Sequence, residues 1–294
     1  MTILRVEDLT KNYGKHTALH KINFEINKGE IFGFIGPNGA GKSTTIRILL
    51  GIIKATGGKA TILGQNVWKN TIYIHQKIAY VPSDVTLWPN LTGGEVIDLF
   101  LKLQGTTNKR KKENLIELFD FDPSKKCCTY SKGNRQKVAL ISAFASDAEL
   151  FILDEPTSGL DPLMEKVFQD CIKQVKKEEK SVLLSSHILS EVERLCDRVA
   201  IIRKGEIIQT GTLEELKKLN YLLLNVKTKN EVIGIEKACG IYEITKHNDF
   251  LSLKVNKNKL GEIIDFLNTF YITDLKTSTP TLEELFMQHY QSRD

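Results

Sequence analysis

The sequence predicts an α/β protein in which a large domain with a parallel sheet is followed by a small α+β domain. Two apolar runs, 31–35 and 149–154, each end in a polar loop, as buried parallel strands do. Apolar runs of this kind alternate with helical patterns up to about residue 218, and the pattern then restarts near Asn220. We therefore expect domains 1–218 and 219–294, with a helical subdomain at about 84–145 in the first.

Composition limits the classes of protein that the chain can belong to. Its 294 residues, 41% hydrophobic and 26% charged, suffice for one large domain or two modest ones. No apolar stretch reaches the ~18 to 20 residues of a membrane helix, and no secretory signal is visible, so we expect a cytoplasmic protein. The five cysteines have neither metal-ligand spacing nor the pattern of a disulfide framework.

The net charge of +5 says little about partners. The densest basic run, 109–112, begins a predicted helix, and a solvated helix face explains it more simply than nucleic-acid binding does. We therefore predict no nucleic-acid partner.

The loop that follows the strand 31–35 predicts a phosphate site. The segment 34–44 reads FIGPNGAGKST, and Gly36, Gly41, Lys42 and Ser43 form the Walker A, or P-loop, pattern between a strand and a helix. Such a loop turns backbone N–H groups inward at the positive end of a helix. The alternative, a glycine-rich turn that matches by accident, fits the strand-loop-helix context less well. The predicted nucleotide ligands are Gly36, Pro37, Asn38, Gly39, Ala40, Gly41, Lys42, Ser43 and Thr44.

The pattern assigns roles to two of these side chains. Lys42 reaches the β- and γ-phosphates, and we expect it to be exposed and outside the core. The Ser43 hydroxyl would bind a Mg²⁺ ion that is shared with the phosphate oxygens.

Two carboxylates at the end of the run 149–155 predict hydrolysis. The carboxyl ends of parallel strands are where α/β sheets hold ligands. Asp154 is expected to hold Mg²⁺, directly or through water, and Glu155 to act as the general base for the attacking water. An isolated Asp-Glu pair is more often a solvated turn, but here it follows a strand and a P-loop lies upstream.

The spacing of apolar residues predicts the main helices and strands. Residues 92–121 are expected to be helical throughout, with two successive apolar periods. The second domain is predicted as strand 221–227, helix 230–238, strands 241–247 and 250–255, helix 257–269, strand 271–276 and a last helix 281–290. That order, β-α-β-β-α-β, is ferredoxin-like.

The segment 130–137, YSKGNRQK, leads into a helix whose start Ser131 caps. By itself this is an ordinary helix start, but together with the Walker motifs it resembles the signature motif of ABC ATPases, usually Leu-Ser-Gly-Gly-Gln. The resemblance covers residues 1 to about 218. It implies a P-loop NTPase of the ABC ATPase type whose signature residues Ser131, Gly133 and Asn134 contact the ATP that is bound to a partner cassette.

The resemblance also implies roles for three residues that are otherwise unremarkable. Asp161 lies in the match to the D-loop, although it is equally a helix cap before Pro162. His187 follows the apolar run 181–186 and matches the switch histidine of the γ-phosphate; without the family it would be an ordinary histidine. Tyr13 fits the aromatic residue on which adenine stacks, and its alternative is a tyrosine in a turn between strands.

The chain departs from the family pattern at two places. Ser83 stands at the Q-loop position, where the family usually has a Gln that touches the metal site and relays to the membrane partner. We expect the serine to weaken that sensing. In the signature, Lys132 replaces a Gly and Asn134 replaces the Gln, while Ser131 and Gly133 remain as γ-phosphate donors.

The family mechanism implies the partners and the location. Two cassettes pair head to tail and enclose ATP with Mg²⁺, so a second ATPase subunit, identical or related, and a separate integral membrane permease are expected. The chain would be cytoplasmic and peripheral on the inner face of the membrane. Its C-terminal domain, with the segment 280–286, resembles the tails of bacterial exporter ATPases of the drug and antimicrobial-peptide type. We therefore predict the motor subunit of an ABC exporter. The alternative is a soluble ABC ATPase acting on ribosomes or DNA.

Overall fold

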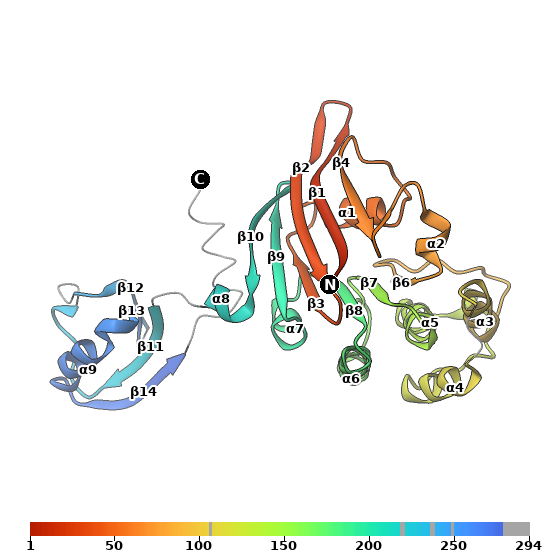
Figure 1. The fold of residues 1–294 in the computed structure, drawn as a ribbon. Coiled ribbons are helices and arrows are strands. Elements are labelled where there is room, and N and C mark those ends of the chain that lie inside the picture. Colours follow the sequence, from red (N-terminus) through yellow and green to blue (C-terminus); the bar gives the residue numbers. More distant parts are fainter. Residues whose placement is uncertain (106–107, 218–220, 236–238, 248–249, 279–294) are drawn as a thin grey trace. The chain divides into compact units, whose positions relative to one another are not determined.

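The computed structural model describes residues 1–105, 108–217, 221–235, 239–247 and 250–278. The chain divides into two compact units, Met1–Leu213 and Glu214–Asp294 (Figure 1). Each unit has its own hydrophobic core.

The first unit is built on a six-stranded sheet with the order β10-β9-β3-β8-β7-β6. Its strands are β3 (Ile31–Ile35), β6 (Ile78–Val81), β7 (Leu150–Asp154), β8 (Ser181–Ser186), β9 (Arg198–Arg203) and β10 (Glu206–Thr212). The pairs from β9 to β6 are parallel, and β10 adds an antiparallel edge. Every residue of β3, β7 and β8 is buried, which explains why these strands are continuous apolar runs in the sequence.

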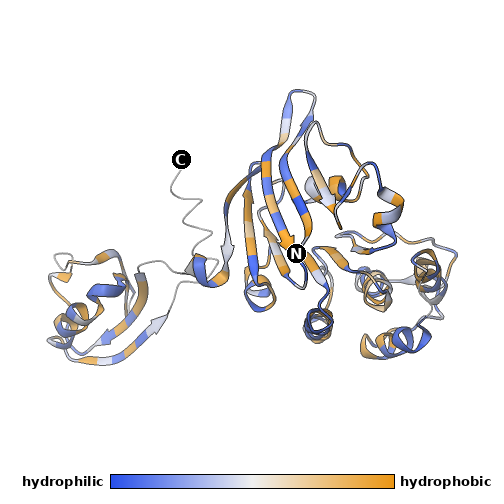
Figure 2. Ribbon diagram, in the orientation of Figure 1, coloured by the Kyte–Doolittle hydropathy of each residue, from blue (hydrophilic) through white to orange (hydrophobic). Residues whose placement is uncertain are grey.

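A second, antiparallel sheet packs against the first. Its strands are β1 (Thr2–Tyr13), β2 (His16–Asn27), β4 (Gly57–Ile62) and β5 (Gln65–Asn66), in the order β2-β1-β4-β5. Along β1 and β2 hydrophobic and hydrophilic residues alternate, as half-buried strands require (Figure 2). Phe24 of β2 stacks on Phe32 and Phe34 of β3, with ring centroids 5.6 and 5.2 Å apart. The two sheets therefore share one core.

The helices of the first unit fall into two groups. The first group is α1 (Lys42–Leu49), α2 (Thr71–His75), α6 (Pro162–Lys177) and α7 (Leu189–Leu195). The other group, α3 (Gly93–Leu103), α4 (Lys109–Leu118) and α5 (Lys132–Ala145) with the 3₁₀ turn η1 (Cys127–Thr129), gathers beyond β6 (Figure 1). No helix in the described part of the chain combines the length and the apolar character needed to cross a bilayer.

The helix expected throughout residues 92–121 is interrupted. The first helix, α3, ends at Leu103, Gly105 has a φ of +72°, and Asn108 caps the start of α4 through the Lys111 N–H. A glycine in this left-handed conformation ends a helix, so the two apolar periods belong to two helices.

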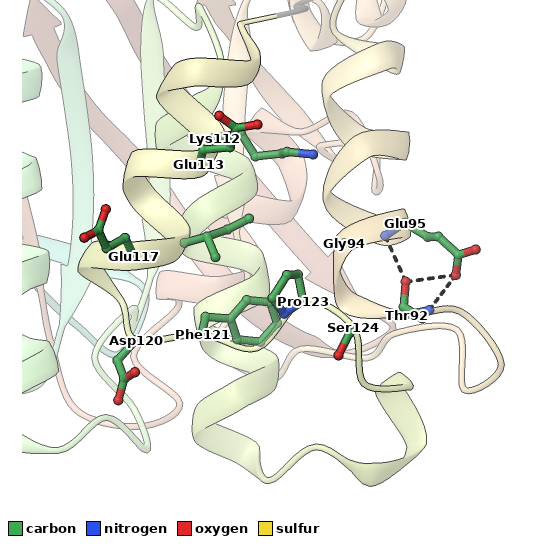
Figure 3. A pocket seen from close by; sticks show the side chains of 11 residues that line it. Thr92, Gly94, Glu95, Lys112, Glu113, Glu117, Asp120, Phe121, Pro123 and Ser124 are labelled. Carbon is green, nitrogen blue, oxygen red and sulfur yellow. Dashed lines mark hydrogen bonds between the residues drawn. The ribbon is translucent and has the colours of Figure 1, made fainter.

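A pocket of about 690 Å³ lies between these helices (Figure 3). The figure shows Thr92 and Glu95 bonded to each other; they form a reciprocal capping box at the start of α3. Across the pocket, Lys112 pairs with Asp98 at 2.7 Å. The capping box belongs to α3 alone, and the Lys112–Asp98 pair joins α4 to α3, so these polar groups already have structural partners.

The second unit contains the four-stranded antiparallel sheet β12-β13-β11-β14. Its elements are β11 (Tyr221–Thr228), β12 (Ile241–Lys246), β13 (Leu251–Asn256), the 3₁₀ turn η3 (Lys257–Lys259), α9 (Leu260–Asn268) and β14 (Ile272–Ser278), preceded by α8 (Leu213–Lys217). One face carries the core, to which α9 contributes Ile263 and Leu267. With β11 and β13 in the centre, the strand order is the one that a ferredoxin-like connection produces.

The first helix predicted for this unit is wrong over residues 230–234, which are irregular. Gly234 has a φ of +80°, which no helix accommodates. Val232 and Ile235 are nevertheless buried in the core of the unit, so the apolar spacing reports packing and not a helix. Residues 236–238 and the predicted last helix, 281–290, lie outside the described residues.

A chain of residues 1–217 should fold without the rest, because the first core contains residues 3–202 and the second contains residues 224–267, with none in common. We expect a single cooperative thermal transition whose midpoint lies within about 4 °C of the corresponding transition of the full chain, equivalent to ~1 kcal/mol at this size. Circular dichroism of both chains measures it. Aggregation of the shorter chain, or loss of cooperativity, would mean that the two units depend on each other.

Candidate functional site

Three neighbouring strands place the predicted motifs at one edge of the sheet. The central strand, β8, pairs in parallel with β3 on one side and with β7 on the other. Ile35 is level with Ser186, and Asp154 is level with Ser185. The P-loop, His187 and Glu155 follow these strand ends directly, so segments more than 100 residues apart meet there.

The P-loop has the shape that only its glycines allow. A Cβ on Gly36 would lie 2.4 Å from the carbonyl oxygen of Ile202, and Gly41, at the N-cap of α1, has a φ of +113°. The Ala40 carbonyl accepts a hydrogen bond of 2.9 Å from the Gly205 N–H, which ties the loop to the turn between β9 and β10. The P-loop is thus packed against Ile202 and the turn between β9 and β10.

A pocket of about 290 Å³ opens in front of this loop. It brings together nine of the residues predicted from the sequence, and it adds His16 and Ala18 of β2, which no motif indicated. The predicted residues that line it are Tyr13, Pro37, Asn38, Gly39, Gly41, Lys42, Ser43, Thr44 and Glu155. Gly36 and Ala40 are not among the lining residues, consistent with their contacts on the other side of the loop.

Lys42 is buried, with 5% of its side chain exposed, so the expectation of an exposed lysine is wrong. Its Nζ donates to the carbonyl oxygens of Gly36 at 2.6 Å and Pro37 at 3.3 Å, because the loop curls around the ammonium group. Burial lowers the pKa of Lys42, and the nearby charges of Glu155 and Asp154 act in the opposite direction. The ammonium is therefore fixed at the floor of the pocket.

Ser43 and Asp154 form the oxygen pair expected for Mg²⁺. Ser43 Oγ donates to Asp154 Oδ2 at 3.2 Å, and Ser185 Oγ donates to Oδ1 of the same carboxylate. Sequence reasoning missed Ser185, because its partner Asp154 lies 31 residues away on the neighbouring strand. Among the described residues, no group of three or more His, Cys, Asp or Glu is placed to hold a metal ion. This donor set suits Mg²⁺ bound together with a nucleotide, since Mg²⁺ typically keeps water and phosphate oxygens beside one or two protein ligands.

The two predicted catalytic side chains face each other. His187 Nδ1 lies 3.3 Å from Glu155 Oε1, and the same oxygen lies 3.8 Å from Lys42 Nζ. Glu155 has a φ of +49°, uncommon for a residue with a side chain, and its N–H donates to the Ser185 carbonyl at 3.0 Å. The His187 side chain is 57% exposed, so Glu155 is oriented by the fold while His187 is open to an incoming group.

Tyr13 lies at the rim of the pocket with about half of its surface exposed. Lys11 Nζ lies 4.9 Å from its ring centroid. An exposed ring at the mouth of a phosphate site has the position and chemistry needed to stack on a base.

The signature residues lie apart from the pocket and contact the segment after Glu155. Ser131 caps α5 by accepting from the Asn134 N–H at 3.3 Å. A Cβ on Gly133 would lie 2.6 Å from the Gly159 carbonyl oxygen, and Lys132 Nζ donates to Ser158 Oγ at 2.8 Å. None of the predicted signature residues lines the pocket.

Two further predicted residues have structural contacts at their positions. Asp161 Oδ1 accepts from the N–H groups of Leu163 and Met164 at 3.0 Å each, at the start of α6, so the helix cap is present. Ser83 follows β6 between Pro82 and Val85, which line an apolar groove; Ser83 does not line the P-loop pocket. In the same strand, burial and the charge of Asp154 raise the pKa of Tyr80 to about 12.

Comparison with known proteins agrees with this geometry. Residues 19–158 match the model of the family described as "ABC transporter". A bacitracin transport ATP-binding protein of Bacillus licheniformis is 36% identical, with 98% of this chain and 97% of that protein covered. A linearmycin resistance ATP-binding protein of Bacillus subtilis is 32% identical, with 97% of each covered.

Solved structures show the same fold. An ATP-binding subunit of an ABC transporter is 32% identical and has a TM-score of 0.69, with 74% of this chain and 92% of that chain covered. A dimeric bacterial ABC transporter cassette, 24% identical with a TM-score of 0.66, is similar in fold alone. The sequence relatives cover nearly the whole chain, and the P-loop, Asp154 and Glu155 meet at one site. This chain therefore belongs to the ATP-binding proteins of ABC transporters, ATPases that are coupled to transport.

Proposed function

We propose that this chain is the motor subunit of an exporter, hydrolysing ATP to drive efflux through a separate membrane permease. The contact of Glu155 with His187, beside the buried Lys42, carries the hydrolytic part of the proposal. The exporter part is supported by the relatives named for bacitracin transport and linearmycin resistance, which match this chain over nearly its full length.

ATP would lie with its phosphates on the P-loop and its base against Tyr13. The backbone N–H groups of the P-loop at the start of α1, together with Lys42 Nζ, would supply the positive potential that the phosphates need. Ser43 and Asp154 would hold Mg²⁺, which when bound neutralises charge on the phosphate oxygens.

Glu155 would take the proton of the attacking water. Its Oε1 is already aimed at the pocket and has His187 Nδ1 as a neighbour. His187, largely exposed, would contact the γ-phosphate from the end of β8. This division leaves Lys42 as the ligand that binds the phosphates and Glu155 as the group that moves a proton.

A second ATPase subunit, identical or related, would complete the site. Ser131, Gly133 and Asn134 lie at the N-terminus of α5, away from the pocket of their own chain. A partner that docks head to tail would bring such a helix terminus to the γ-phosphate, where its N–H groups favour an anion. Asp161, at the start of α6, lies in the neighbouring D-loop segment and would belong to the same interface.

The permease would dock on the apolar groove beside Ser83. The groove has a volume of about 580 Å³ and is lined from α2, α3, α5 and the β6 loop, including Pro82 and Val85. Ile72 and Leu103 at its edge are 81% and 67% exposed. Exposed apolar side chains around a groove are typical of a protein interface. The chain would then be peripheral on the cytoplasmic face of the membrane.

The basic run of α4 gives little support to the ribosome or DNA alternative. Lys112 is paired with Asp98, and Lys111 lies 4.0 Å from Glu178, so part of the run is used within the fold. We accordingly propose no nucleic-acid partner.

The docking surface can be tested by coexpression with the candidate permease and purification from detergent-solubilised membranes. Ile72→Glu and Leu103→Glu should each reduce recovery of the complex at least ~10-fold, because a charge on an apolar interface costs more than ~1.4 kcal/mol. Leu118→Glu, at a leucine of α4 that is 56% exposed and lies outside the groove, is the control. Unchanged recovery of both groove variants would refute the surface, and wild-type chain found only with ribosomes would refute the exporter.

Glu155→Gln separates binding from chemistry. The amide keeps the shape of the side chain but accepts no proton, so ATP hydrolysis should fall roughly 10²- to 10⁴-fold. Removing a negative charge near the γ-phosphate should also favour the ATP-loaded closed pair, so the variant should form a dimer with Mg²⁺ and ATP, detectable by light scattering. Glu149→Gln, directly before the start of β7 and paired with Lys77, is the control. Wild-type turnover in Glu155→Gln would show that Glu155 is not the base.

Ser83→Gln restores the residue that the family usually has. If Ser83 weakens sensing of the metal site, basal ATPase activity of the variant should equal or exceed that of the wild type. Ser83→Ala, which removes the hydroxyl without extending the side chain, should stay within ~2-fold of wild type, since a surface substitution away from the pocket changes little. A sharp loss of activity in Ser83→Gln would show that the loop has adapted to the serine.

A further inference from the structure

We propose that Glu191 is a positioning residue for hydrolysis: its buried carboxyl group holds the hydroxyl of Ser186 and thereby fixes His187 against Glu155. The inference rests on the role proposed for His187. Glu191 belongs to α7, directly after His187, and no sequence motif indicated it.

Glu191 is only 4% exposed, which is unusual for a carboxylic acid unless the group is used. Its Oε2 accepts a hydrogen bond of 2.8 Å from Ser186 Oγ. Its Oε1 is buried and, within the described part of the chain, has no hydrogen-bond partner. An apolar side chain would fill this place at lower cost, so packing alone does not explain a glutamate here.

The Ser186 hydroxyl connects Glu191 to the backbone around His187. Because Ser186 Oγ donates to Glu191, it is free to accept, and it accepts the Ile188 N–H at 3.0 Å. The two bonds fix the chain on both sides of His187. The imidazole itself is largely exposed, and its contact at 3.3 Å is with Glu155. Its direction therefore depends on the backbone that Ser186 and Glu191 hold.

Thr157, in the segment after Glu155, lies near the same carboxyl group. Burial raises the pKa of Glu191, while the hydrogen bond from Ser186 and the neighbouring side chain of Thr157 lower it, and Glu165 of α6 raises it further. Thr157 is itself buried two residues after the base. The carboxyl group of Glu191 thus lies between the two loops that carry the catalytic pair.

The alternative is a purely structural role in the packing of α7, and the two roles predict different kinetics. A positioning residue affects kcat through His187 and leaves ATP binding intact, because neither Glu191 nor Ser186 lines the nucleotide pocket. If Glu191 has only a structural role, its replacement should lower the melting temperature, and any change in kcat should not depend on whether His187 is present.

The experiment measures steady-state ATPase kinetics, ATP affinity and melting temperature for Glu191→Ala, Glu191→Gln and Ser186→Ala in the full chain. We expect kcat to fall about 10- to 100-fold in both alanine variants, as small misplacements of catalytic groups do, with KM within ~2-fold of wild type. Glu191→Gln should retain kcat within ~3-fold, because its amide oxygen still accepts from Ser186. Val192→Ala, a fully buried truncation on the same helix, is the control for packing and should lower the melting temperature but not kcat.

The Glu191→Ala substitution made in a His187→Ala variant tests whether Glu191 acts through His187. If Glu191 acts through His187, adding Glu191→Ala to His187→Ala should lower kcat no further. Unchanged kcat in Glu191→Ala, equal losses in the Ala and Gln variants, or an additive loss in the double variant would each overturn the inference. Wild-type kcat in His187→Ala alone would overturn the proposed role of His187 together with the inference. Loss of kcat in His187→Ala but not in Glu191→Ala would overturn the inference alone.

Discussion

The parallel pairing of β8 with β3 and β7 is the constraint on which the site depends. Each strand end delivers one component, and the register decides their separation. Because side chains alternate across a sheet, a slip of one residue in β8 would turn Ser185 away from Asp154 and displace His187 from Glu155. The complete burial of the three strands secures this register, since a slipped strand would have to bury Ser185 and Ser186 without their partners.

The conformations of the loops at these strand ends are set by contacts with the neighbouring strands and turns, on the side away from the ligand pocket. Gly36 lies too close to Ile202 for any side chain, and Ala40 is bonded to Gly205. On the other loop, Glu155 keeps a left-handed backbone while its N–H binds the Ser185 carbonyl. Preorganisation of this kind lets fixed N–H groups and one ammonium stabilise a phosphate without rearranging.

The features that could be predicted from the sequence are those determined by residues close together in the chain. Strand ends, the P-loop, the Ser131 cap and the Asp161 cap before Pro162 all follow from neighbours a few residues apart. Burial of Lys42 and the contacts of Ser185 and Glu191 depend on partners that are distant or carry no motif. The predicted helix fails over residues 230–234 for a related reason: the spacing of Val232 and Ile235 is set by the core that they enter, and Gly234 ends any helix between them.

Lys132, at the start of α5, has an unfavourable interaction with the helix dipole that tertiary contacts offset. A lysine at position 132 puts a positive charge at the positive end of α5, which is unfavourable by about 0.3–1 kcal/mol. Its Nζ is bound by Ser158 Oγ and its stem lies beside Gly159, while Gln136 of the same helix donates to the Pro156 carbonyl at 2.9 Å. These contacts join the start of α5 to the loop that leaves β7 after Glu155. A movement of that loop would therefore be transmitted to the start of α5 through a side-chain contact that a glycine at position 132 could not make.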